Sequence, residues 1–107
     1  MKILSVVVPC YNSAAYMRRC IESLLPGGDD LEILVIDDGS TDDTLAIARD
    51  YERAYPGMVR AIHQENTGHG GAINTGLRHA TGAYFKVVDS DDWLDSLALE
   101  KALARLR

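Results

Sequence analysis

Acidic side chains gather in two short segments of this 107-residue sequence. Asp37 and Asp38 lie in the first half, and Asp89, Asp91 and Asp92 lie near the end. Residues two apart on an extended chain point the same way, so Asp89 and Asp91 are expected to face one site. Neighbouring carboxylates repel each other without a cation, and their oxygens suit Mg²⁺ or Mn²⁺, which complete their shells with phosphate oxygens and water. The later segment therefore predicts a divalent cation beside a phosphate, whereas capping of the following helix would explain Asp92 alone.

The earlier acidic pair stands beside a tight turn, in the run Asp37-Asp38-Gly39-Ser40. One carboxylate can accept a hydrogen bond from a ring N–H or a ribose hydroxyl of a nucleotide while the other caps the turn. Ordinary capping before a helix is the alternative interpretation. The presence of two adjacent carboxylates favours a bound ligand, because the two repel each other unless a ligand or a counter-charge offsets the repulsion.

Two further segments carry groups suited to a nucleotide. Pro9 ends an apolar run by removing a backbone donor, which leaves Tyr11 as an aromatic face for a base and Asn12 as a donor and acceptor, unless Asn12 only caps the next helix. The run Gly68-His69-Gly70-Gly71 precedes a helix and can bring backbone N–H groups near an anion, with His69 either a donor to phosphate or a plain loop residue. Neither GxGxxG after the first strand nor GxxxxGKS/T occurs, so NAD-type and P-loop sites lose their main support.

These segments need a scaffold that brings them together, and the periodicity of the sequence predicts one. Four strand-sized apolar runs alternate with four amphipathic helical patterns. The predicted strands cover residues 3–8, 32–36, 58–62 and 83–88. The first, third and fourth predicted helices run from Met17 to Leu25, from Ala72 to Ala80 and from Leu94 to Leu106. The second predicted helix is capped by Ser40 or Thr41, has Asp42 and Asp43 in its first turn and ends at Tyr55.

This alternation predicts an α/β domain with three α/β/α layers around a Rossmann-like parallel sheet. Right-handed crossovers favour the strand order 3-2-1-4. In such sheets ligands bind outside the carboxyl ends of the strands. The four polar segments, residues 9–13, 37–43, 66–71 and 89–93, all follow predicted strands and are therefore expected to converge on one edge.

Composition narrows the class of protein. With 47% hydrophobic residues and a formal net charge of −5, the sequence predicts one globular domain and argues against nonspecific binding to nucleic acid or anionic membranes. No apolar run approaches the roughly 20 residues of a membrane span, and the apolar start is interpreted as a strand because no small-residue cleavage site follows it. Cys10 and Cys20 lack metal-ligand spacing and are expected to be reduced, partly buried thiols.

Four motifs, taken in order, resemble those of the family 2 glycosyltransferases, which have the GT-A fold. They are VVVPCYNS at residues 6–13, VIDDGSTDDT at residues 35–44, ENTGHGGAINTG at residues 65–76 and ATGAYFKVVDSDDWL at residues 80–94. Each motif alone is modest, but together they span nearly the whole chain at the family's spacing. Ile73 departs from the pattern, because many members carry Arg or Lys there.

The resemblance implies a nucleotide-sugar site with an associated metal ion. The implied donor-site residues are Pro9, Tyr11, Asn12, Asp38, Gly70, Asp89 and Ser90. Among them, Pro9, Tyr11 and Asp38 would contact the base and the ribose. Asp89 and Asp91 would be the outer members of a DxD motif, with Asp89 near the ribose and Asp91 on a Mg²⁺ or Mn²⁺ ion that bridges the diphosphate.

The resemblance also implies that donor binding and acceptor binding belong to different parts of a longer chain. Family domains continue into an acceptor-binding half that supplies the catalytic base, and nothing after Trp93 resembles that half. Residues 1–107 are therefore expected to be the donor-binding portion, which binds a nucleotide sugar without transferring it. The implied reaction is inverting transfer from a UDP-sugar to an acceptor hydroxyl in polysaccharide, lipopolysaccharide or glycolipid synthesis.

Two further expectations concern the location of the protein in the cell and its self-association. Activated sugars are cytosolic, which predicts a cytoplasmic location, and a full-length enzyme at the cytoplasmic face of a membrane fits as well. The fourth strand, left as an exposed edge, is expected to favour self-association.

Three alternatives remain at the level of sequence. A haloacid-dehalogenase phosphatase has its acidic motif early in the chain, and a receiver domain has its acidic pair after the first strand and a phosphorylated Asp after the third. Here the third strand leads into His63-Gln64. A non-catalytic nucleotide-binding module is the third alternative, because no catalytic base is identified.

Overall fold

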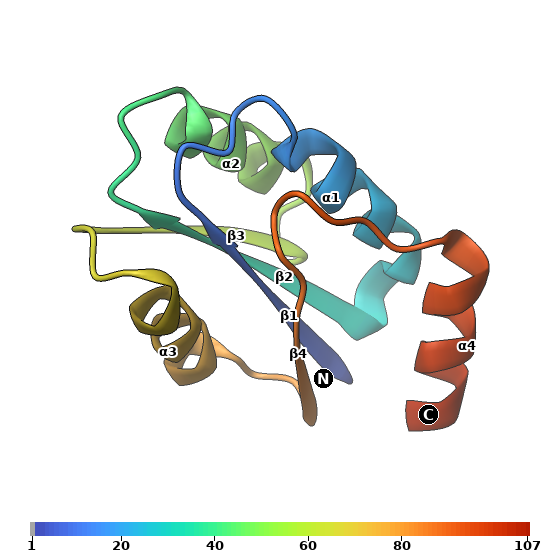
Figure 1. Ribbon diagram of the computed structural model, residues 1–107. Helices are drawn as coiled ribbons and strands as arrows, with labels where there is room; N and C mark the ends of the chain where they lie inside the picture. Colours follow the sequence, from blue (N-terminus) through green and yellow to red (C-terminus); the bar gives the residue numbers. More distant parts are fainter. Residues whose placement is uncertain (1) are drawn as a thin grey trace.

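The computed structural model describes residues 2–107 and contains a four-stranded sheet with helices on both faces (Figure 1). Its strands are β1 (Leu4–Cys10), β2 (Leu31–Asp38), β3 (Val59–Gln64) and β4 (Tyr84–Val87). All pairings between them are parallel, and their order is β3-β2-β1-β4. The predicted α/β class and the predicted strand order are confirmed.

The helices of the described residues connect and follow these strands. They are α1 (Met17–Leu24), the 3-10 helix η1 (Leu25–Asp30), α2 (Thr44–Ala54), α3 (His69–His79) and α4 (Ser96–Leu106). None of the helices in residues 2–107 is long and apolar enough to cross a membrane.

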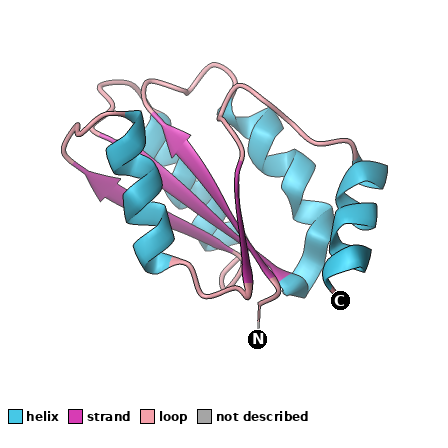
Figure 2. Cartoon of the chain, turned by 60° about the horizontal axis from the view of Figure 1, so that its bottom comes forward, coloured by secondary structure: helices cyan, strands magenta, loops and turns pink. Residues whose placement is uncertain are grey.

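Two apolar clusters, one on each face of the sheet, make the three layers. Val6 and Val8 of β1 pack with the buried faces of α1, α2 and α4, whereas Val7 packs with α3 through Ala72 on the opposite side (Figure 2). Successive strand residues point to opposite faces, so an unbroken apolar run fills both clusters. Full burial of each such side chain contributes about 1.5–3 kcal/mol.

Helix α3 lies close against the sheet because Gly76 has no side chain. A Cβ atom at Gly76 would lie 2.6 Å from Cγ2 of the fully buried Val7 in β1. Any side chain at this position would push the helix away from the strand.

Helix α2 begins later than predicted. It starts at Thr44, so Ser40 and Thr41 do not cap it and Asp42 precedes its first turn. The Asp42 carboxylate accepts hydrogen bonds from the Thr44 amide (3.0 Å) and hydroxyl (2.5 Å) and from the Ala14 amide (3.1 Å). Such side-chain bonds offer the backbone an alternative to the helix, and here they tie the segment before α2 to the one before α1.

The starts of the last two helices also differ from prediction. Helix α3 begins at His69 rather than at Ala72, so the glycine-rich run forms its first turn. Helix α4 begins at Ser96, where Asp95 accepts a backbone hydrogen bond of 2.7 Å. Asp92 is therefore not the cap of α4.

A buried carboxylate joins the strands at the amino-terminal edge of the sheet. Glu32 of β2 is 3% exposed and accepts hydrogen bonds from the Ser5 hydroxyl (2.6 Å) and from the Thr81 amide (2.6 Å) and hydroxyl (2.7 Å). Burial raises the pKa of Glu32, but these bonds and the Arg60 guanidinium outweigh it, so its pKa lies below the ordinary value. Glu32 thereby holds the segment leading into β4 against β1.

Strand β4 forms one edge of the sheet, as predicted. It pairs with β1 on one side, and Tyr84 and Phe85 are exposed. The backbone on the other side faces outward, which is the arrangement that permits pairing with a further strand.

The two cysteines are buried free thiols in the cluster shared by α1, α2 and α4. Burial, and then the neighbouring Cys20, raise the pKa of Cys10 to about 12. Burial and the carboxylates of the turn after β4 raise the pKa of Cys20 to about 12. Both groups are therefore thiols, not thiolates, in the folded protein.

Candidate functional site

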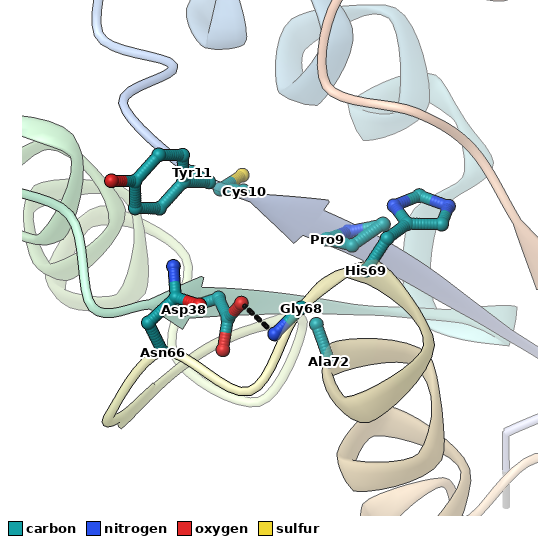
Figure 3. A pocket seen from close by; sticks show the side chains of 8 residues that line it. All are labelled: Pro9, Cys10, Tyr11, Asp38, Asn66, Gly68, His69 and Ala72. Carbon is teal, nitrogen blue, oxygen red and sulfur yellow. Dashed lines mark hydrogen bonds between the residues drawn. The ribbon is translucent and has the colours of Figure 1, made fainter.

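The carboxyl ends of β1 and β2 and the start of α3 border a pocket of about 260 Å³, which we call the strand-end pocket (Figure 3). It is lined by Pro9, Cys10, Tyr11, Asp38, Asn66, Gly68, His69 and Ala72. The pocket lies beside β1, where the strand order reverses and where open α/β sheets bind ligands. Its volume is slightly below the roughly 300–1,000 Å³ of whole-ligand pockets, which suits one part of a nucleotide.

The predicted donor-site residues divide into two groups. Pro9, Tyr11 and Asp38 line the strand-end pocket, whereas Asn12, Gly70, Asp89 and Ser90 are not in its lining. The structure thus brings the strand-end segments to one edge without placing every predicted side chain in the same cavity.

Tyr11 and Asn12 follow β1 but have different surroundings. The Tyr11 side chain is 52% exposed at one end of the pocket, so its ring face is available to a flat ligand (Figure 3). Asn12 has a positive φ of 49°, its backbone amide donates to Ser40 Oγ (2.9 Å), and its side-chain oxygen accepts from the Thr41 amide (2.8 Å). Asn12 therefore joins the β1–α1 loop to the β2–α2 loop.

Ser13 connects a third loop to these two. Its amide donates to Thr44 Oγ1 (2.8 Å), and its hydroxyl lies 2.8 Å from the hydroxyl of Ser90, which follows β4. Ser90 is 8% exposed and is therefore engaged within the protein. No pattern in the sequence predicted this link between Ser13 and Ser90.

The adjacent carboxylates at the end of β2 have separate partners. The Asp37 side chain is 1% exposed, lies 2.7 Å from His63 Nδ1 and accepts a hydrogen bond from the Ser40 amide (3.1 Å). The His63 imidazole and the Ser40 amide therefore offset the repulsion expected between Asp37 and Asp38. The doubling of the carboxylates has a structural reason and does not by itself require a ligand.

Asp38 holds one wall of the strand-end pocket. Its Oδ1 accepts from Gln64 Nε2 (2.9 Å) and from the Thr67 amide (2.8 Å) and hydroxyl (3.2 Å), and its Oδ2 accepts from the Gly68 amide (2.9 Å). Burial raises the pKa of Asp38, but these bonds outweigh it and hold the pKa below its ordinary value. Oδ1 thus accepts three bonds and Oδ2 accepts one, whereas each carboxylate oxygen offers about two acceptor positions. A direct bond from Asp38 to a ribose or a base, which stays a prediction, would have to reach the second acceptor position of Oδ2.

Gly39 allows the turn after β2 to approach the β3–α3 loop. Its φ is +75°, and a Cβ there would lie 2.7 Å from the backbone nitrogen of Asn66, which lines the pocket. Only glycine meets both conditions without strain. Gly39 therefore allows Asn66, on one side of the pocket, to lie close to the turn after β2.

The acidic segment after β4 is a turn and not an extended chain. The Asp92 amide donates to the Asp89 carbonyl (2.9 Å), so the extended backbone predicted for Asp89 to Asp91 is wrong. Asp89 Oδ1 lies 3.6 Å from Nε2 of His69. Asp91 lines a different hollow with Arg19, whose guanidinium lies 3.4 Å from the ring centroid of Trp93.

The structure limits the kind of metal site that the predicted residues can form. Among residues 2–107, no group of three or more His, Cys, Asp or Glu side chains is close enough to hold a metal ion. Asp89 and Asp91 are exposed hard-oxygen donors at the carboxyl edge of the sheet. This donor set fits an ion that takes most of its ligands from a phosphate and water, as Mg²⁺ does, and does not fit an all-protein cage.

The fold and its edge pocket define the broad class: a Rossmann-like α/β domain built to bind a ligand at the carboxyl ends of its strands. Comparison with known families is more specific. The model of glycosyl transferase family 2 matches residues 5–107, and the chain belongs to this family. The resemblance inferred from the four motifs is confirmed, and family membership stands against the receiver and phosphatase alternatives.

Curated relatives are glycosyltransferases of greater length. The chain is 43% identical over 106 residues to a chondroitin synthase of Escherichia coli, covering 98% of this chain and 15% of that protein. It is 47% identical over 90 residues to the uncharacterized glycosyltransferase YibD of Escherichia coli (strain K12), covering 83% of this chain and 26% of that protein. The chain therefore spans about a quarter or less of these two relatives.

Solved structures share the fold. Residues 1–349 of S. aureus TarS in complex with UDP-GlcNAc match with a TM-score of 0.83 and 35% identity, over 97% of this chain and 30% of that chain. The mannosyltransferase PcManGT from Pyrobaculum calidifontis, in complex with GDP-Man and Mn²⁺, matches with a TM-score of 0.82 and 31% identity, over 94% and 31%. The chain thus has the fold of part of a GT-A glycosyltransferase.

Proposed function

We propose that the chain forms the donor-binding part of a glycosyltransferase and binds a nucleoside-diphosphate sugar, most readily a UDP-sugar, at the strand-end pocket. The observation that supports this most directly is the pocket itself, at the strand order reversal of a sheet whose structural relatives bind UDP-GlcNAc and GDP-Man. The base stacks on the exposed ring of Tyr11, and Pro9 lines the same pocket. Asp38 fixes the backbone of Thr67 and Gly68, which forms the facing wall.

Asp89 and Asp91 are the residues that would hold Mg²⁺ or Mn²⁺, together with the diphosphate. PcManGT, which shares the fold, is described in complex with Mn²⁺. When bound, such an ion neutralises charge on the departing nucleoside diphosphate. Both carboxylates belong to the turn after β4, and the Ser13–Ser90 contact holds that turn against the β1–α1 loop.

Transfer itself belongs to a longer protein in this proposal. An acceptor hydroxyl loses its proton to a base and attacks the anomeric carbon with inversion, while the bond to the nucleoside diphosphate breaks. Acceptors of polysaccharide, lipopolysaccharide or glycolipid synthesis fit the family. The chain spans 15% and 26% of the two curated relatives described above, so we expect it to bind the donor without completing transfer. We expect binding in the cytoplasm, because activated sugars are cytosolic.

Calorimetric titration with UDP, with and without Mn²⁺, tests the proposal. The Asp91→Ala variant should lose the Mn²⁺-dependent part of binding. The matched Asp92→Ala variant, which removes an exposed carboxylate from the same turn, should keep it. Absence of binding to any nucleoside diphosphate by the folded chain would contradict donor binding, and UDP binding that ignores Mn²⁺ would contradict the metal site.

A further inference from the structure

We infer that His69 is the diphosphate-binding side chain of the strand-end pocket and donates a hydrogen bond to a phosphate oxygen of the nucleotide. This inference rests on the proposed function and assigns the polarity of the ligand within the pocket. The base lies at the Tyr11 end, and the phosphates leave the pocket at the His69 end, next to Asp89, which lies just outside the lining.

The position of His69 supplies the first argument. It is the first residue of α3 and lines the pocket at the end away from Tyr11, with Cys10 and Pro9 between the two side chains (Figure 3). A nucleotide that stacks its base on Tyr11 therefore extends its phosphates toward His69.

The hydrogen-bonding state of His69 supplies the second argument. Its side chain is 64% exposed and makes no hydrogen bond with any residue of the described chain, residues 2–107. Nε2 lies 3.6 Å from Asp89 Oδ1, which is longer than a hydrogen bond but close enough for both groups to contact one ligand. In either neutral tautomer an imidazole carries one N–H donor, so the ring can bind a phosphate oxygen without being charged.

Charge balance supplies the third argument. Asp38 carries a negative charge in the pocket lining, Asp89 lies just beyond it, and no Lys or Arg lines the pocket. A diphosphate placed among carboxylates needs a donor or a cation. Among the side chains of the lining, His69 is the one that combines a free N–H with a position beside Asp89.

The surroundings of His69 leave room for such a ligand. A Cβ at Gly70, the next residue of α3, would meet no atom within 4 Å. The His69 side chain is itself 64% exposed, so a phosphate oxygen can reach its ring from solvent.

Binding of UDP and of uridine to the same variants tests the inference, because uridine lacks the phosphates. UDP is titrated calorimetrically with Mn²⁺ present, and uridine is titrated by NMR at millimolar concentration. His69→Ala should weaken UDP binding about tenfold and leave uridine binding unchanged. His69→Gln, which keeps an N–H donor, should restore much of the UDP affinity. His79→Ala, at the other end of α3, should match the wild type with both ligands.

The outcomes separate the two proposals. If the folded wild type does not bind UDP, both the proposed function and this inference are contradicted. If the wild type binds UDP but His69→Ala binds it equally well, or loses UDP and uridine to the same extent, only the assignment of His69 is overturned.

Discussion

Replacing Asp38 with Asn separates a wall-forming role of this carboxylate from a ligand-binding one. A hydrogen bond to a charged group contributes about 1.5–3 kcal/mol, roughly twice as much as a bond between neutral groups, so loss of the charge weakens every bond that Asp38 accepts. Asn keeps one oxygen, which can still accept from Gln64 and Thr67, but its NH₂ group would replace the oxygen that now accepts from the Gly68 amide. We therefore expect Asp38→Asn to lower the free energy of unfolding by about 3 kcal/mol.

Thermal unfolding without nucleotide measures this loss. For a domain of this size about 1 kcal/mol corresponds to roughly 4 °C, so the expected fall in Tm is about 12 °C. Asp50→Asn is the matched control, because Asp50 pairs with Arg53 on the exposed face of α2 and should change stability by less than about 0.5 kcal/mol.

The pH dependence of the same variant gives a second readout. The pKa of Asp38 is lowered by folding, so its ionised form stabilises the native state fully above the unfolded-state pKa. That contribution is lost as the pH falls through the folded pKa. The stability gap between wild type and Asp38→Asn should therefore be constant near neutral pH and narrow below about pH 4.

One result would refute this reasoning. If Asp38→Asn unfolds within about 1 kcal/mol of the wild type and yet loses UDP binding, Asp38 contacts the donor directly and does not act by holding the Thr67–Gly68 wall. A stability loss near 3 kcal/mol, with the gap closing in acid, supports the wall-forming role.

Three further predictions address the rest of the scaffold. Gly76→Ala should lower the free energy of unfolding by about 1–3 kcal/mol in urea titrations, because its methyl group would overlap Val7; an unchanged midpoint would contradict the close packing of α3. Glu32→Gln should destabilise the protein near neutral pH and lose that difference below about pH 4, since folding lowers the pKa of Glu32. Cys10 and Cys20 should react with a thiol reagent at pH 8 only after unfolding, and rapid reaction of the native protein would contradict their burial.

The sequence predicted the layers and strand order but not the internal partners of the acidic residues. Apolar runs and helical stripes report burial directly, so the elements followed from periodicity. The partners of Asp37 and Asp38 depend on the register of β2 against β3, which places them beside His63 and Gln64. No local pattern specifies that register, and carboxylates with protein partners were consequently interpreted as free for a ligand.

Helix starts were displaced for a related reason. Asp42 and Asp95 bond to nearby backbone groups, and such bonds decide where a helix begins within a few residues. The turn after β4 likewise depends on a backbone bond from Asp92 to Asp89 that side-chain spacing does not reveal. The predicted helix starts and the predicted conformation after β4 therefore differ from the structure because of local hydrogen bonds, and not because of the overall pattern of elements.

The contacts of Asn12 and Ser13 have a consequence for the dynamics of the loops. Their backbone amides donate to side chains of the β2–α2 loop and of the start of α2, and the Ser13 hydroxyl contacts Ser90 beyond β4. Opening one loop therefore breaks bonds in the others, so the three loops should behave as one cooperative unit. In native-state hydrogen exchange, the amides of Asn12 and Ser13 should exchange as slowly as strand amides, although both residues lie outside regular secondary structure.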